Sequence, residues 1–432
     1  MIGLYNRDSS FFEVTLDSKP LPENVTKDIS DKIISFTYEE EYGKMDSGSL
    51  TILDPDLVYS SFLKQGKPLT LSWGYKQRPI FLSTPIDNNE MWGEYRRKNV
   101  KAIAQFPSGS ATENGVITFN CNFISGEFMR GVKNRTWVSG HKRDVISHIL
   151  TDMGFSGDNQ IIDFHRGNEK IDANTAVTQN KSNFKFLCQL AYEWGAVFKT
   201  AHSLNGPIAL FADRARTDSL DRFASRAGQA ISGQSITLDY KIQTALNTTM
   251  VKSWSYNQSG GGSGDNIQIV MGPNGTPEFR RYITKNEKTL VYKFYPEKVE
   301  AALKNVKDIG KRIELGKSYV NIDNFQDVLD RPDTKDFFTL EMDSTAPQGV
   351  GWTVNCKTLG NPMLTVPMLV NFGKVDPLSR TVKHNSLGWP DQLLSENLGF
   401  RIQKVTHTIT TAGYECDLNI VDWFTISGGA LI

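Results

Sequence analysis

The sequence lacks an excess of charge of either sign and has few cysteines. Its 432 residues include 48 Lys plus Arg and 48 Asp plus Glu, so the formal net charge is zero. Dedicated nucleic-acid binders usually carry a strong basic excess, so this class is disfavoured, although DNA could still pass beside such a surface. The cysteines form no Cys-x-x-Cys pair, so neither a zinc site nor a redox motif is indicated and we expect reduced thiols. They are Cys121, Cys188, Cys356 and Cys416.

Targeting and membrane signals are also missing. The first 12 residues contain Asn6, Arg7 and Asp8 where a signal peptide would have an apolar core. No apolar run approaches the length of about 20 residues that a membrane-spanning helix needs. We therefore expect a chain that is soluble and intracellular when made, with no membrane anchor.

No complete catalytic or ligand-binding motif is present. The glycine-rich stretch from Gly260 to Gly264 lacks the Gly-Lys-Ser/Thr of a phosphate-binding loop, and no Gly-x-Ser-x-Gly elbow occurs. The histidines show no metal-ligand spacing, and His407 is expected to be a hydrogen-bonded strand residue. We therefore predict no catalytic, cofactor-binding or metal-binding residue, no bound cofactor and no enzymatic activity. The six histidines are His141, His148, His165, His202, His384 and His407.

Two runs of charge have ordinary interpretations. Glu39, Glu40 and Glu41 are interpreted as a solvated strand edge that discourages unwanted pairing. The basic run 96–98 is interpreted as a solvated face, because no ladder of aromatic residues accompanies it.

The pattern of apolar residues predicts an α+β fold that is predominantly β. In residues 1–132, short alternating segments predict strands at 11–16, 33–38, 49–53, 69–73 and 116–123, which is typical of a small barrel or sandwich. The polar stretch 87–115 is expected to be a long excursion from this β structure.

Residues 133–229 predict a compact α+β unit. Apolar residues at helical spacing predict helices at 141–153 and 183–194. Ser182 or Asn180 is the expected cap of the second helix, and Gly195 its left-handed stop.

The remaining sequence returns to β patterns. Strands are predicted at 235–240 and 248–256, a flexible loop at 257–264 and a helix at 296–309. Alternation over 400–420 predicts a hairpin with one buried face and a bulge after Ile402.

Two stretches and this hairpin resemble the baseplate hub proteins of phage tails. Residues 178–196 (TQNKSNFKFLCQLAYEWGA) are similar to a segment of late-control-D-like phage proteins and of the hub part of type VI secretion VgrG spikes. Residues 360–373 (GNPMLTVPMLVNFG) resemble a barrel segment of the same family, departing from it at Val366-Pro367. The hairpin 405–420 resembles the usual sequel of that segment.

The resemblance implies a fold with two tube-like antiparallel β-barrels per chain. We expect the first barrel at 1–132, the α+β domain at 133–229, and the second barrel from 230–258 and 355–432. Residues 259–354 would then be an α+β insertion in the second barrel. The family's loose motifs carry no catalytic residues. A needle-like repeat is absent, so the needle is expected to be a separate protein.

The resemblance also implies a structural role in the virion tail baseplate, assembled in the host cytoplasm. A closed homotrimer would present six barrels, adapt a six-fold tail tube to a three-fold spike or tip, and form part of the DNA channel. The expected partners are the tail tube or tube-initiator protein, the spike or tail-tip protein, other baseplate proteins, and DNA only in transit. Strand edges at 49–53 and 400–409 are the candidate contacts between copies. The alternatives are a tail-associated peptidoglycan hydrolase and a receptor-binding tail protein.

Overall fold

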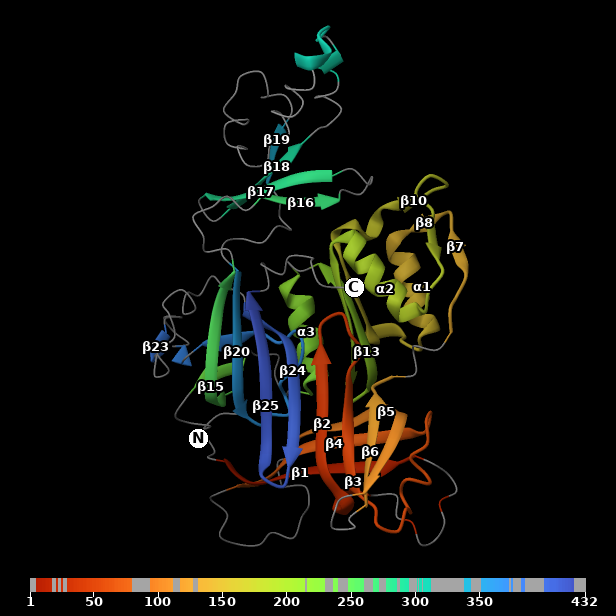
Figure 1. Cartoon of the computed structure of the whole chain (residues 1–432), viewed down its shortest axis with the longest axis vertical. Coiled ribbons are helices and arrows are strands. Elements are labelled where there is room, and N and C mark those ends of the chain that lie inside the picture. The colour runs from red at the N-terminus through yellow and green to blue at the C-terminus, as the bar shows by residue number, and fades with distance from the viewer. Residues whose placement is uncertain are drawn as a thin grey trace. The chain divides into compact units, whose positions relative to one another are not determined.

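A twelve-stranded sheet is the largest sheet among the described residues of the computed structural model (Figure 1). Two compact units are formed, one from Met1–Asn257, Thr353–Trp423 and Gly428–Ile432 and the other from Gln258–Trp352 and Phe424–Ser427. The structure describes residues 5–17, 21, 25, 29–79, 94–111, 117–126, 131–213, 216–229, 236–239, 248–259, 267–271, 277–285, 288–294, 301, 303–304, 306–311, 338–342, 351–372, 374–375, 382–384 and 400–422.

Half of the large sheet comes from the first part of the chain. Its strands are β1 (Tyr5–Leu16), β2 (Ile33–Glu41), β3 (Ser47–Leu53), β4 (Pro68–Pro79), β5 (Glu94–Ala111) and β6 (Ile117–Ile124), with a short helix η1 (Ser30–Lys32). Residues 87–115 were predicted to leave the β structure, and this prediction is wrong for residues 94–111. They form β5, which pairs with β4 on one side and β6 on the other. Val100, Ala102, Ile103 and Ala104 are all buried along it, and small side chains and a bulge between Gln105 and Ser108 further obscure any alternation.

The other half comes mainly from the end of the chain. Its strands are β14 (Ile236–Asp239), β15 (Thr248–Ser259), β20 (Gly351–Leu359), β21 (Val370–Phe372), β24 (Phe400–Thr410) and β25 (Gly413–Asp422). The predicted hairpin is confirmed, with its bulge between Ile402 and Lys404. The segment 235–240 shares a sheet with this hairpin, as the split second barrel requires, while the two-barrel arrangement itself stays a prediction.

The two halves join directly along β2 and β24. The full strand order is β1-β4-β5-β6-β3-β2-β24-β25-β20-β15-β14-β21. Antiparallel pairing runs from Ser35 opposite Thr410 to Glu41 opposite Lys404. β2, β3 and β24 are therefore interior strands, so the interpretation of residues 39–41 as an edge and the candidate contact edges at 49–53 and 400–409 are wrong.

Aromatic side chains fill the interior at this junction. The Trp73 ring lies 4.7 Å from Tyr38, 5.3 Å from Phe36 and 5.6 Å from His407, centroid to centroid. Gly360 packs against the face of Tyr414 so closely that a Cβ atom there would lie 2.0 Å from the ring. The junction is thus packed as core and leaves little space for larger side chains.

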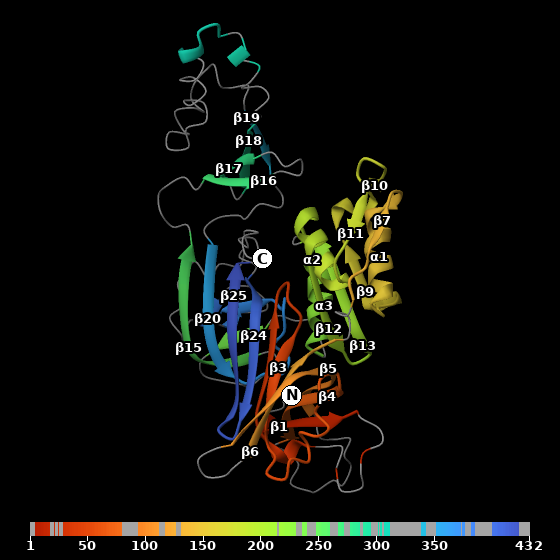
Figure 2. The same cartoon turned by 45° about the vertical axis from the view of Figure 1, so that its right-hand side comes forward.

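An α+β region precedes the second half. Helices α1 (Lys142–Asp152), α2 (Asn183–Trp194) and α3 (Thr217–Ala227) accompany a three-stranded sheet in the order β12-β13-β9 (Figure 2). The predicted helix at 183–194 is confirmed, and Gly195 ends it in the left-handed conformation with φ 71°. Ser182 holds the N-cap position without a side-chain capping bond. The remaining elements here are β7 (Arg135–Trp137), β8 (Gly140–His141), η2 (Gly157–Asn159), β9 (Gln160–Asp163), η3 (His165–Asn168), β10 (Lys170–Ile171), β11 (Val177–Gln179), β12 (Ala196–Ser203) and β13 (Gly206–Asp213).

The second unit contains an antiparallel sheet in the order β16-β17-β18-β19. Its strands are β16 (Ile267–Met271), β17 (Pro277–Lys285), β18 (Lys288–Phe294) and β19 (Phe338–Met342), and the first unit also contains the pair β22 (Lys374–Val375) and β23 (Val382–His384). The predicted helix at 296–309 and the loop at 257–264 lie largely outside the described residues. Within the described parts, no helix is long and apolar enough to cross a membrane. The observed fold confirms a predominantly β, α+β protein.

Candidate functional site

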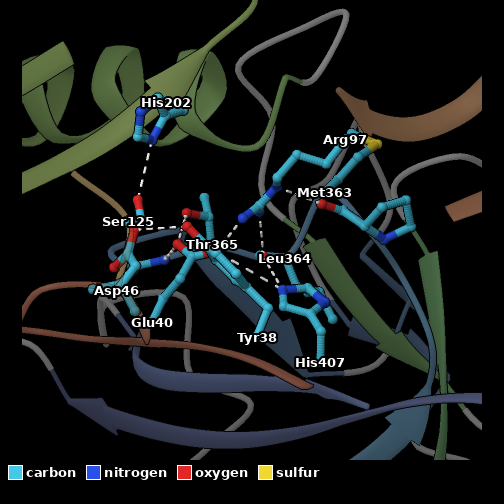
Figure 3. Close-up of polar contacts among 12 residues, drawn as sticks. Tyr38, Glu40, Asp46, Arg97, Ser125, His202, Met363, Leu364, Thr365 and His407 are labelled. Atoms are coloured by element: carbon cyan, nitrogen blue, oxygen red, sulfur yellow. Dashed lines mark hydrogen bonds and ion pairs between the residues drawn. The ribbon is translucent and has the colours of Figure 1, made fainter. Parts of the chain in front are cut away.

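A buried ion pair lies where the two halves of the large sheet meet. Arg97 of β5 is 2 % exposed, and its guanidinium contacts Glu40 of β2. Its Nε donates to the carbonyl of Pro362 at 3.1 Å and its Nη2 to that of Leu364 at 2.7 Å. Figure 3 shows these groups pointing toward one another. The planar guanidinium therefore binds a carboxylate and two carbonyls from separate segments at once.

The carboxylate of Glu40 is held on its other side by the segment 362–366. Its Oε2 accepts a hydrogen bond from the Thr365 hydroxyl and a longer one, 3.5 Å, from the Val366 amide. Burial alone would raise the pKa of Glu40, but Arg97 and other nearby positive groups hold it well below its usual range. Glu40 is therefore ionised and fixed in the interior, where sequence reasoning placed a solvated residue.

His407 of β24 forms a neutral hydrogen-bonded group beside this pair. Its Nε2 donates to the carbonyl of Leu364 at 3.1 Å, which leaves Nδ1 to accept a bond from the Tyr414 hydroxyl at 2.7 Å. Burial lowers the pKa of His407, so the ring stays neutral. The prediction of a hydrogen-bonded strand histidine is confirmed, but the side chain is fully buried where partial burial was expected.

A cysteine lies next to this histidine. The Sγ of Cys416 is 3.3 Å from Nδ1 of His407, a spacing that in an open site could support a nucleophile and its base. Burial raises the pKa of the Cys416 thiol to about 12, so no thiolate forms near neutral pH. The arrangement is therefore a packed hydrogen-bond network and offers no activated nucleophile.

A second buried ion pair connects the α+β region to the sheet. Lys199 of β12 is 1 % exposed and contacts Asp46, which also accepts a bond from the Tyr38 hydroxyl at 3.0 Å. The ammonium also donates to the carbonyls of Glu41 and Lys44, each at 3.1 Å. All three donors of Lys199 are thus used on the last residue of β2 and the loop that follows it.

The remaining sequence candidates do not come together. His141 lies near Asp144, His148 contacts the Trp137 ring, and His165 pairs with Asp213 at 3.0 Å, not with the nearby Asp163. Within the described ranges, no group of three or more His, Cys, Asp or Glu side chains could hold a metal ion. The side chain of His384 lies outside the described residues.

Sequence reasoning missed the residues that form the network. Arg97 was assigned to a solvated basic face and Glu40 to a strand edge, and both are buried. Their partners Pro362, Leu364 and Thr365 are more than 260 positions away from Arg97, so no local pattern could connect them. The alternation in β5 breaks next to Arg97, where the register with β4 shifts, so it gave no signal either.

His202 makes the network sensitive to acid. Its Nδ1 lies 3.1 Å from the Ser125 hydroxyl, and burial, with the charges of Lys101 and Arg97, lowers its pKa to about 4. Between pH 6.5 and 4 the unfolded chain therefore binds the proton and the folded chain does not. The contribution of His202 to stability therefore falls as the pH is lowered through this window, whereas that of Asp46, whose pKa burial raises to about 6, changes in the opposite direction.

We expect a loss on the order of 3 kcal/mol from His202 between pH 7 and pH 4. Urea unfolding at both pH values would measure it, with His202→Asn as the variant that removes the titrating group. The variant should lose less stability than the parent on acidification. Equal losses in the two proteins would contradict the assignment.

Comparison with known proteins gives structural similarity alone. No family model and no curated protein sequence matches the chain. A component of the type VI secretion system of E. coli, described as similar to the T4 bacteriophage tail proteins gp27 and gp5, aligns over 94% of this chain and 76% of its own, with 8% identity and a TM-score of 0.43. The tail protein from Neisseria meningitidis MC58 aligns over 96% and 98%, with 8% identity and a TM-score of 0.46. The 43 kDa tail protein of prophage MuSo2 from Shewanella oneidensis aligns over 96% and 99%, with 10% identity and a TM-score of 0.47.

Proposed function

We propose that the chain is a structural baseplate hub of a phage-type tail and acts as a closed trimer. The observation that carries this proposal is the pairing of β2 with β24, which fuses two β regions far apart in sequence into one sheet. The buried pair of Arg97 and Glu40 adds a polar link across the same junction. Each copy would then present two β regions as one rigid segment of a ring wall.

Three such segments would give six β regions around one axis. The strands that end the described sheet are β1 and β21, so contacts between copies would form there and not at β3 or β24. A head-to-tail contact repeated three times closes the ring and covers sheet edges that would otherwise invite open-ended pairing. Such a ring could match a six-fold tail tube on one side and a three-fold spike on the other, with DNA passing through.

The oligomeric state tests this proposal. Light scattering and negative-stain images of the full chain should give a trimer with a central hole. Truncation after Thr353 removes β24, β25 and most of β20, so it should abolish the ring. A dimer or hexamer of chains in the assembled particle would overturn the proposal.

A further inference from the structure

An open groove lies on the outward face of four neighbouring strands, β15, β20, β25 and β24 (Figure 1). Its volume is about 540 Å³, within the range of roughly 300–1,000 Å³ that small-molecule sites usually have. Exposed Asn355 and Asp417 are among its lining residues, whereas Val354 and Cys416 beside them are buried in the interior. A ligand can therefore enter this groove from solvent without any change in the fold.

Two aromatic side chains of β15 form a strip at one side of the groove. Trp254 lines the groove, and its ring stacks beside that of Tyr256 with centroids 5.7 Å apart and planes at 17°. Residues two apart on a strand point to the same face of its sheet. Tyr256 is 41% exposed, so the strip reaches solvent. The two rings therefore place a flat apolar surface next to the polar residues of the neighbouring strands.

Polar groups that both donate and accept hydrogen bonds line the floor of the groove. The Nδ2 of Asn419 donates to Oδ1 of Asn355 at 2.8 Å, which leaves each amide with further donor and acceptor capacity. Asp417 and Thr406 are register partners on β25 and β24 and lie in the same floor. Amides, a carboxylate and a hydroxyl so arranged can bind several neighbouring hydroxyl groups of one ligand at once.

The lysines of the groove are paired with carboxylates of the same sheet. Lys404 lies 2.9 Å from Glu39, and Lys357 lies 2.7 Å from Glu415. An anionic ligand would have to compete with these carboxylates for the lysines, and Asp417 would repel it. Duplex DNA in particular needs phosphate-binding cations that are not already neutralised. The charge of the groove therefore favours an uncharged ligand.

We propose that this groove binds a neutral saccharide, with one sugar ring stacked on Trp254 and its hydroxyl groups bound by Asn355, Asp417 and Asn419. The C–H face of a sugar ring is apolar and packs on an aromatic ring, while its hydroxyl groups both donate and accept hydrogen bonds. An aromatic wall beside a charge-compensated polar floor matches these two properties together. The argument uses contacts within one copy of the chain and does not depend on the proposed ring.

Calorimetric titration of the full chain with neutral tetrasaccharides tests the proposal. The probes are cellotetraose, maltotetraose and chitotetraose, which differ in linkage and in the N-acetyl group. At least one should bind with one site per chain. Trp254→Ala should weaken this binding about tenfold or more, because truncation of a tryptophan anchor removes a large share of the binding energy. Trp254→Phe, which keeps an aromatic face, should bind more tightly than Trp254→Ala.

The matched control removes an exposed aromatic ring elsewhere. Tyr192 of α2 is 59% exposed and lies outside the groove, so Tyr192→Ala should bind as the unmodified chain does. Tetragalacturonate, whose rings carry carboxylates, is the charged probe and should bind more weakly than the neutral probe that binds best.

Three results would overturn the proposal. One is that none of the neutral tetrasaccharides binds at millimolar concentration. Another is that Trp254→Ala binds as tightly as the unmodified chain, or no more weakly than Tyr192→Ala, which would place the binding elsewhere. The third is tighter binding of tetragalacturonate than of every neutral probe. Light scattering of the same samples reports the oligomeric state separately, so a failure of the proposed ring is distinguishable from a failure of the saccharide site.

Discussion

Replacing Arg97 with methionine should lower the free energy of unfolding by about 3–5 kcal/mol, because Glu40 would then remain buried without its cation. The carbonyls of Pro362 and Leu364 would also lose their donors. Methionine keeps much of the volume, so the loss reports the charge and its hydrogen bonds more than a cavity. Urea unfolding followed by tryptophan fluorescence suits the measurement, since the guanidinium lies 5.2 Å from the centroid of Trp73.

The matched control is Arg166→Met. Arg166 pairs with Glu169 at the surface, 2.7 Å away, and exposed pairs contribute about 1 kcal/mol or less. A second variant, Arg97→Met with Glu40→Gln, should recover part of the loss because it removes the uncompensated charge. If Arg97→Met differed from the control by less than 1 kcal/mol, the central role of this pair would be wrong.

Replacing Lys199 with methionine should cost a similar amount, about 3–5 kcal/mol, measured by the same unfolding experiment at pH 7. Asp46 would keep only the Tyr38 hydroxyl, and the carbonyls of Glu41 and Lys44 would lose a donor. Lys185→Met, on the exposed side of α2, is the control and should be nearly neutral.

The pH dependence of this variant distinguishes a lost charge pair from poor packing. Burial already raises the pKa of Asp46 to about 6 with Lys199 present. Without Lys199 this pKa would rise further, so the destabilisation should shrink as the pH is lowered toward 4. A packing defect would cost the same at both pH values. Constant destabilisation from pH 7 to pH 4 would therefore contradict the ion-pair interpretation.

Periodic segments were predictable from the sequence alone. The helix at 183–194 and the hairpin at 400–420 follow from apolar residues at spacings of 3.6 and 2, and both are confirmed. The bulge after Ile402 was visible because the alternation shifts by one residue there. Each of these elements buries one face, and the spacing of its own apolar residues is enough to predict it.

The junction was not predictable in the same way. Arg97 lies in a basic run and Glu40 in the middle of three acidic residues, so the sequence predicted both at the surface. Both are buried. Each is stabilised by partners that arrive from the end of the chain. A buried charge is recognisable only with its counter-charge, and the spacing between them carries no periodic signal.

The pairing of β2 with β24 also sets the order of events during synthesis. The ribosome makes β2 early, and β24 emerges some 360 residues later, which takes roughly 20–70 s at ordinary translation rates. During this interval one edge of β2 has no partner strand from the chain itself. Glu39 and Glu41 then lie on an open edge, where charge discourages pairing with other nascent chains. The same carboxylates would later bind Lys404. They would therefore first keep the nascent chain from pairing with other chains and then neutralise Lys404 in the folded protein.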